Sequence, residues 1–366
     1  AEGARAYVKK RVIPDELLED FGVGYAPGGW TALTDALKKR GFHEEELILA
    51  GLCARREKGS GIYDRFRDRL MFPIRDQNGK TIGFTGRVLS SENQEAKYVN
   101  TPQSPTYDKS AVLYGLDLAK NEIRAQGFAV VVEGQMDVIG SWRGGVKNVV
   151  ASSGTALTER QVTALARCAP LILLAFDADA AGLQAARRGI DLALTAGLDV
   201  KIITLPPGLK DPDECTLRDP KLWQTAVQNA EHLIDFDIRK AQEQNLSDPL
   251  IKKRALDFIL SDIVKLASAV ERDHWLHRLS EEFKVNEGAF REELSKKPKN
   301  NGTDIRVPSK TALVDNISAR KESRQDMLSR SIVGYIAVFP ELRETIFKTV
   351  RVEICSDHWR PLYSLV

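Results

Sequence analysis

An alternation of apolar runs and helix-like segments between residues 127 and 206 constrains the fold more than any other feature. The apolar runs are FAVVVE at 128–133, NVVAS at 148–152, LILLAF at 171–176 and VKIITL at 200–205. Helix-like segments separate them at 135–143, 158–168 and 180–197. Continuous apolar strands joined by helices are typical of a parallel sheet that is covered on both faces. We therefore expect an α/β unit in this part of the chain.

Acidic side chains follow three of these predicted strands. Glu133 ends the first strand, Asp177 and Asp179 follow the third, and Asp211 and Asp213 follow the fourth. Ligands of an open parallel sheet bind beyond the carboxyl ends of its strands, so these acids could meet at one edge. Crowded carboxylates raise one another's pKa values, and a hard divalent cation such as Mg²⁺ relieves that conflict. The alternative interpretation is that each acid only caps a helix or stabilises a turn.

The N-terminal 120 residues have a mixed pattern with a local excess of positive charge. Asn78-Gly79 is a two-residue turn signal between two apolar runs, which predicts a β-hairpin. Residues 65–87 carry two acids, Asp68 and Asp76, and six bases: Arg65, Arg67, Arg69, Arg75, Lys80 and Arg87. Aromatic side chains lie among or near these bases, namely Tyr63, Phe66 and Tyr98. Charge with interleaved rings is what a single-strand groove needs, although a solvated face or internal pairing with Asp64 and Asp68 would give the same pattern.

The remaining sequence predicts a domain order. We expect a basic mixed α+β subdomain at 1–120, the parallel-sheet subdomain at 121–215, a helical subdomain without strands at 216–295, a polar linker at 296–322, and the start of a further helical region at 323–366. The four cysteines form no CxxC motif, and no apolar run approaches the ~20 residues of a membrane helix. The N-terminus has no signal-peptide core, so we expect a cytoplasmic protein without a membrane partner.

The motifs VVVEGQMDVI, AFDADAAGLQAARRG and YDRFRDRLMFPIRDQNGKTIGFTGRVL together resemble the catalytic core of bacterial DnaG-type primases. VVVEGQMDVI and AFDADAAGLQAARRG resemble the Toprim domain, with Glu-Gly after the first strand and Asp-x-Asp after the third. YDRFRDRLMFPIRDQNGKTIGFTGRVL, KYVNTPQSPTYDKSAVLYGLDLAK and LPPGLKDPDE resemble the flanking parts of the same family. The resemblance covers roughly residues 5–295.

The resemblance implies a role for particular residues. The catalytic metal ligands would be Glu133, Asp177 and Asp179, with contributions from Asp211 and Asp213. The groups that bind nucleotide phosphates would be Arg87, Lys97, Asn100 and Lys109. The template would be bound by Arg11, Arg65 and Arg67. The implied cofactor is Mg²⁺ or Mn²⁺.

The resemblance also implies an activity and partners. It predicts a DNA-directed RNA polymerase that makes short primers from ribonucleoside triphosphates on single-stranded DNA, in the cytoplasm as part of the bacterial replisome. Another Toprim enzyme (a topoisomerase or nuclease) and a non-catalytic single-stranded DNA-binding module are the alternatives. The family's zinc-binding cysteines are absent and its helicase-docking region is only begun, so we expect a core fragment without zinc and with incomplete docking to the replicative helicase.

Overall fold

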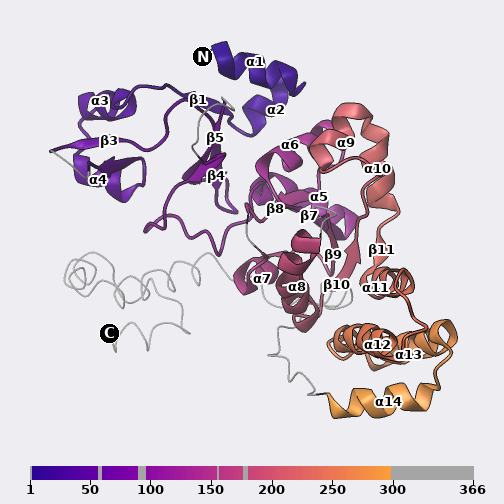
Figure 1. Ribbon diagram of the computed structural model, residues 1–366. Helices are drawn as coiled ribbons and strands as arrows, with labels where there is room; N and C mark the ends of the chain where they lie inside the picture. Colours follow the sequence, from indigo (N-terminus) through magenta and orange to yellow (C-terminus); the bar gives the residue numbers. More distant parts are fainter. Residues whose placement is uncertain (1, 57–59, 90–95, 155, 176–179, 298–366) are drawn as a thin grey trace, which may run out of the picture. The chain divides into compact units, whose positions relative to one another are not determined.

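The computed structural model describes residues 2–56, 60–89, 96–154, 156–175 and 180–297, with main chain only at 180–186 (Figure 1). All of these residues belong to one compact unit, Ala1–Val307. Asp177, Asp179 and the predicted helicase-docking region at 323–366 lie outside the described residues. The predicted subdomain boundaries at 120, 215, 295 and 322 stay predictions.

The N-terminal part is built on a four-stranded antiparallel sheet. Its strand order is β1 (Gly24–Ala26), β4 (Arg69–Arg75), β5 (Thr81–Val88) and β6 (Tyr98–Asn100). A separate two-stranded ribbon pairs β2 (Cys53–Arg55) with β3 (Ile62–Asp64). The helices here are α1 (Glu2–Lys10), α2 (Asp15–Asp20), α3 (Ala32–Lys39) and α4 (Glu44–Leu49).

The predicted hairpin is confirmed, but its two-residue turn is wrong. The N–H of Asp76 donates to the carbonyl of Lys80, so three residues rather than two connect the strands. The N–H of Gly79 donates to the Asp76 carbonyl, and Gly79 has a φ of 83°. A glycine with positive φ at the end of a three-residue loop matches the twist of the strands as well as a two-residue turn does. The Asn-Gly pair therefore does not by itself determine the length of the loop.

The parallel sheet forms as predicted at the centre of the chain. Four parallel strands run in the order β8 (Val149–Ala151), β7 (Phe128–Val132), β9 (Leu171–Leu174) and β10 (Asp199–Ile202). Alternate residues of β7 point into different cores: Val131 belongs to one hydrophobic cluster, and Val130 and Val132 belong to another. Both faces are therefore buried, as the uninterrupted apolar runs predict.

Helices cover both faces of this sheet (Figure 1). The cluster that contains Val131 includes residues of α5 (Leu116–Gln126), α7 (Glu159–Ala166) and α8 (Ala180–Thr195). The cluster that contains Val130 includes residues of α6 (Gln135–Arg143), α9 (Pro212–Arg218) and α10 (Pro220–Gln228). The α6 helix starts just after β7, so its first residues lie near the carboxyl edge of the sheet, and α9 follows β10 after the loop at 203–211.

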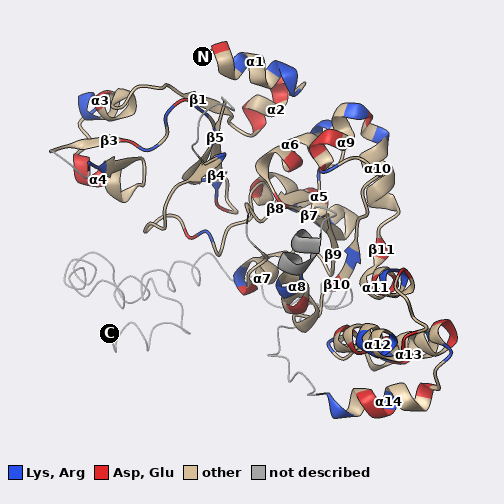
Figure 2. Ribbon diagram, in the orientation of Figure 1, with Lys and Arg blue, Asp and Glu red and all other residues tan. Residues whose placement is uncertain are grey.

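Residues 216–295 form helices joined by short connections, and they contain one short strand. The helices after α10 are α11 (Leu233–Gln242), α12 (Pro249–Ile263), α13 (Ala269–Phe283) and α14 (Glu287–Lys296). The prediction that this region lacks strands is wrong at β11 (Glu231–His232), which pairs antiparallel with β10. Two residues are too few to show any periodicity. Figure 2 shows basic and acidic residues interspersed along α11–α14, and no helix in the described part of the chain is long and apolar enough to cross a membrane.

Candidate metal and nucleic-acid site

The acidic edge begins where β7 ends. Glu133 follows the strand directly, and Gly134 is the N-cap of α6. Asp137 lies in the first turn of that helix, and its Oδ2 accepts a hydrogen bond from the N–H of Gly134 at 2.9 Å. Asp137 is not among the site residues predicted from the sequence. The available signal was its spacing of four residues from Glu133, which places both acids at the same strand–helix junction.

The pKa of Asp137 reports the crowding of acids at this edge. Burial is the largest cause of a pKa raised to about 8, and Asp211, Asp213 and Glu133 add to it by charge repulsion. The hydrogen bond from the Gly134 N–H works in the opposite direction. The structure therefore brings acids from the ends of β7 and β10 within electrostatic reach of one another. The potential ligands are all carboxylate oxygens, and their mutual repulsion contributes to the raised pKa of Asp137. Such a set of ligands fits a hard divalent cation.

Asp211 combines a structural and a potential binding role. It is the N-cap of α9, and its Oδ1 accepts from the N–H of Glu214 at 2.7 Å. The alternative capping interpretation is thus correct for this residue, yet its charge also contributes to the crowding at Asp137. No group of three His, Cys, Asp or Glu residues suited to a metal ion is present within the described ranges, which exclude Asp177 and Asp179.

Asp213 is held differently from its neighbours. Its side chain is only 2% exposed, and it forms ion pairs with Arg11 at 2.6 Å and with Arg143 at 2.9 Å. Burial raises the pKa of Asp213, and the two guanidinium groups counter that rise. Sequence reasoning did not find Arg143, because nothing in the local sequence indicates a partner 70 residues away.

A basic and aromatic cluster lies next to this acidic edge. The guanidinium of Arg87 stands over the rings of Tyr7, at 4.9 Å, and Tyr98, at 5.3 Å. It also donates to the Tyr98 hydroxyl at 2.7 Å. Burial raises the pKa of Tyr98 to about 12, so this hydroxyl stays protonated. Tyr7 in turn lies 5.7 Å from the guanidinium of Arg11, which links the cluster to Asp213.

A second aromatic cluster is exposed on the N-terminal part. Trp30 is 59% exposed, and the Arg67 guanidinium lies 4.3 Å above its ring. Tyr63 meets the Trp30 ring edge-on at 5.7 Å. The main-chain oxygen of Asp64 accepts from Arg67 at 2.6 Å and fixes the guanidinium in place. Sequence reasoning missed Trp30, although a tryptophan after Pro-Gly-Gly in a loop is a signal for exposure.

Internal pairing explains part of the basic excess, but among the described residues it does not use the carboxylates of Asp64 and Asp68, which have other partners. The Asp64 carboxylate caps α3 through the N–H groups of Leu33 and Thr34, and Asp68 accepts from the Tyr25 hydroxyl. Arg69 is buried and donates to main-chain oxygens of Gly86 and Ala96.

Two further members of the predicted groove lie elsewhere. Arg75 forms an ion pair with Asp117. Phe66 is only 4% exposed, so the prediction that its ring could stack on a base is wrong: it lies on the inward side of the chain.

The other predicted phosphate-binding residues are more scattered. Lys97 is exposed and Lys109 is half-buried. Neither ammonium group has a hydrogen-bond or ion-pair partner in the described part of the chain. Asn100 lies on β6, and its buried Oδ1 has no hydrogen-bond partner there. Arg65 is half-buried with an unpaired Nε. Their predicted roles stay predictions.

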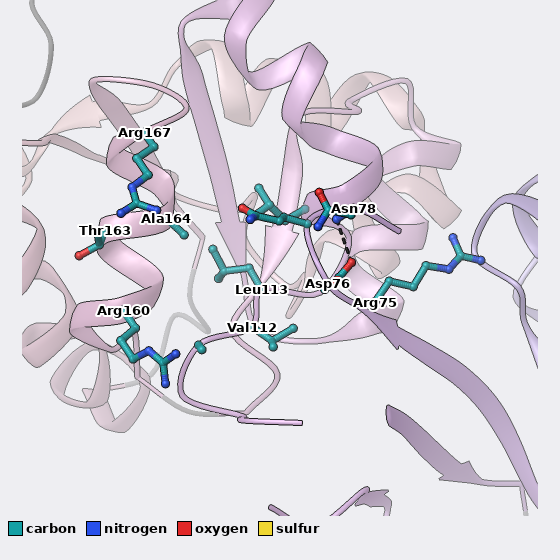
Figure 3. A pocket seen from close by; sticks show the side chains of 12 residues that line it. Arg75, Asp76, Asn78, Val112, Leu113, Arg160, Thr163, Ala164 and Arg167 are labelled. Atoms are coloured by element: carbon teal, nitrogen blue, oxygen red, sulfur yellow. Dashed lines mark hydrogen bonds between the residues drawn. The ribbon is translucent and has the colours of Figure 1, made fainter. Parts of the chain in front are cut away.

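A pocket of about 520 Å³ lies between α7 and the turn of the β4–β5 hairpin (Figure 3). Arg160 and Arg167 extend from α7 beside it, and Val112 and Leu113 form an apolar wall. Arg160 also forms an ion pair with Asp108. The acids at the ends of β7 and β10 do not line this pocket, so it is separate from the candidate site.

The acidic strand ends and the helix-covered parallel sheet place the chain in the class of Toprim-containing proteins. A Toprim-like family description matches residues 130–216, and the description "DNA primase catalytic core, N-terminal domain" matches residues 1–120. The chain is also similar to a solved DNA primase domain from Pseudomonas aeruginosa, with 33% identity, a TM-score of 0.68, and coverage of 79% of this chain and 91% of that one. The chain belongs to the family of bacterial DnaG-type primase catalytic cores.

Other relatives agree with this assignment. The DNA primase of Clostridium acetobutylicum is 38% identical over 314 residues, which cover 84% of this chain and 51% of the relative. That of Halalkalibacterium halodurans is 37% identical over 80% of this chain and 49% of the relative. The chain thus spans about half the length of these curated relatives. A DnaG primase catalytic domain solved bound to single-stranded DNA is 31% identical, with a TM-score of 0.68 and coverage of 78% and 90%.

Proposed function

We propose that this chain is the polymerising core of a bacterial DNA primase and joins ribonucleotides into short RNA on single-stranded DNA. The observation that carries the proposal is the contact between the acidic edge and the basic cluster: Asp213 pairs with Arg11 at 2.6 Å, and the Arg11 and Arg87 guanidinium groups both lie over the Tyr7 ring. The family relationship supports it, since the relatives are named DNA primase and one of them was solved with single-stranded DNA. A topoisomerase or nuclease is not favoured, because the matching proteins are primases.

A divalent cation fits the acidic edge. Glu133 and Asp211 would hold it together with Asp177 and Asp179, and we propose Mg²⁺ or Mn²⁺ as the ion. The bound ion would supply neutralisation of the charge that develops during phosphoryl transfer. Asp137 lies beside this set. A bound cation would offset the charge repulsion that helps to raise the Asp137 pKa, whereas the larger contribution, from burial, would remain.

The chain's own residues would do the positioning. Phosphoryl transfer depends mainly on positioning and on charge stabilisation. Arg87, which stands over the rings of Tyr7 and Tyr98, would meet the triphosphate. We assign Arg11 to the triphosphate as well, rather than to the template as the resemblance implies, because its ion pair with Asp213 holds it at the acidic edge. Lys97 and Lys109 offer unpaired ammonium groups for phosphates. The primer's terminal hydroxyl would then attack the α-phosphorus and displace pyrophosphate.

The exposed aromatic cluster would guide the template. Trp30 and Tyr63 offer ring faces to unpaired bases, and Arg67 and Arg65 offer charge to the phosphates. Stacking together with a basic groove binds single strands with little sequence preference. The replicative helicase is a proposed partner through residues outside the described ranges, and the proposed setting is the bacterial cytoplasm.

A matched pair of variants tests the proposal. Asp211 caps α9 and accepts a hydrogen bond from a backbone N–H at 2.7 Å, and Asp219 caps α10 in the same way at 2.9 Å. Asparagine also caps helices well, so Asp→Asn preserves both helix starts. We expect Asp211→Asn to lower ribonucleotide incorporation on single-stranded DNA with Mn²⁺ by roughly 10- to 100-fold. Substitutions that weaken the protein's hold on a bound metal ion typically reduce activity by this amount. Asp219→Asn should keep wild-type incorporation; equal losses in both variants would remove Asp211 from the site.

A further inference from the structure

Both carboxylate oxygens of Asp213 are already used by arginine. Its Oδ2 accepts from Nη1 of Arg11 at 2.6 Å, and its Oδ1 accepts from Nη2 of Arg143 at 2.9 Å. The carboxylate is only 2% exposed, and Arg143 is 9% exposed. A cation approaching Asp213 would have to break two charge-assisted hydrogen bonds and would leave two guanidinium charges uncompensated. Asp211, by comparison, uses one oxygen to accept a neutral backbone N–H.

Arg143 joins three segments that are distant in sequence. Besides the Asp213 carboxylate, it donates to the main-chain oxygens of Arg11 and Asp213 and to the hydroxyl of Thr216. These groups lie just after α1 and within α9, whereas Arg143 ends α6. The three segments therefore meet at one guanidinium.

Two glycines of α6 and its C-cap allow α6 and α9 to pack closely. A Cβ added to Gly140 would lie 2.8 Å from Cα of Asp213, so only glycine lets α6 approach α9 this closely. A Cβ on Gly144 would lie 2.5 Å from the Thr216 side chain. Two glycines one helical turn apart thus bring Arg143 against the start of α9.

We propose that Asp213 is not a metal ligand but the shared acceptor of an arginine clamp, and that Arg143 is the positioning residue of that clamp. Arg143 holds the end of α1 and the Asp213 carboxylate together, and Asp213 orients Arg11 at the acidic edge. Arg11 is 25% exposed and has five N–H donors, of which Asp213 takes one, so it can still meet an anionic phosphate. This inference rests on the proposed function, because it assigns Arg11 to the incoming nucleotide.

The metal part is tested by calorimetric titration of the apo protein with MnCl₂. Asp213→Asn should change the Mn²⁺ affinity by no more than ~3-fold, whereas Asp211→Asn should weaken it by at least ~10-fold. An equal loss in both variants would make Asp213 a ligand and overturn this part of the proposal.

The positioning part is tested by kinetics well below each variant's melting temperature. Arg143→Gln should raise KM for ribonucleotides about 10-fold and should change kcat less than ~2-fold. A 10-fold change in KM corresponds to the low end of the free energies that hydrogen bonds to charged groups contribute. Arg143→Lys should restore part of the affinity. A lower melting temperature with an unchanged KM would make Arg143 merely structural and would overturn the positioning role. This test stands even if Asp213→Asn does not fold.

A third measurement separates this proposal from the proposed function. In thermal unfolding, the melting-temperature losses of Arg143→Gln and Asp213→Asn should be strongly non-additive in the double variant, since either change alone breaks the clamp. Additive losses would overturn the clamp whatever the activity. A wild-type chain that shows this coupling but neither binds Mn²⁺ nor incorporates nucleotides would refute the proposed function and, with it, the assignment of Arg11 to the nucleotide.

Discussion

Replacing Trp30 with alanine should weaken single-stranded DNA binding without removing any charge. The ring is 59% exposed and makes its described contacts with Arg67 and Tyr63. Stacking of one base on an aromatic side chain contributes about 1–3 kcal/mol by alanine substitution. The dissociation constant should therefore rise about 5- to 150-fold.

The structure also fixes what this substitution should leave unchanged. Little apolar surface is lost from the core, because most of the Trp30 ring is in solvent, so the melting temperature should barely move. No phosphate contact is removed, so the slope of log affinity against log salt should equal that of the wild type. Arg65→Ala combined with Arg67→Ala should instead flatten that slope.

The assay is fluorescence anisotropy with a labelled oligodeoxythymidine at several salt concentrations. Phe42, 48% exposed and on the same part of the chain, provides the control, and Phe42→Ala should bind as the wild type does. Trp30→Phe should retain part of the affinity because it retains a ring. Wild-type affinity in Trp30→Ala would refute the stacking argument, and a flattened slope would mean that the variant acts through Arg67.

Three further predictions concern stability. Arg187→Met should cost about 3–5 kcal/mol in urea unfolding, because it leaves the Asp237 carboxylate, 2% exposed, without its guanidinium. Asp262, 3% exposed, loses the same guanidinium but keeps Lys265 at 3.2 Å; a total loss below about 1 kcal/mol would contradict this. Gly140→Ala should cost about 1–3 kcal/mol by the same measurement, because its methyl group meets the Asp213 backbone, and an unchanged midpoint would be inconsistent with the close helix approach. Burial lowers the pKa of His232 to about 4. As the pH falls from 6.5 to 4, the unfolded chain binds a proton at His232 and the native chain does not, so the free energy of unfolding decreases. We expect a decrease of roughly 2 kcal/mol, because the Glu271 carboxylate at 3.5 Å partly stabilises the protonated ring in the native state. His232→Asn retains an acceptor for the Ile234 N–H and should lack this part of the pH dependence, which paired denaturation curves at pH 7 and 4.5 would reveal.

The local sequence determined those elements that have a clear hydrophobic pattern or a clear boundary residue. The β7 run of three valines is buried on both faces, and the acid that follows it lies at a strand–helix junction, as the sequence predicts. These features depend on neighbours within a few residues, so propensity and patterning identify them. A two-residue strand such as β11 and the length of the Asp76–Lys80 loop carry no such period, and the structure corrected both.

The tertiary structure decided which charges and rings are available for binding. Phe66 and Arg69 belong to the same basic stretch as Arg67, yet both are buried while Arg67 stacks on an exposed ring. Composition cannot separate them, because burial depends on packing against segments elsewhere in the chain. Asp213 illustrates the point most clearly: its sequence neighbours suggest a metal ligand, but its oxygens accept from Arg11, 202 positions away, and Arg143, 70 positions away. A buried carboxylate takes whatever charged donors the fold brings to it, and only the packing of α1, α6 and α9 determines which those are.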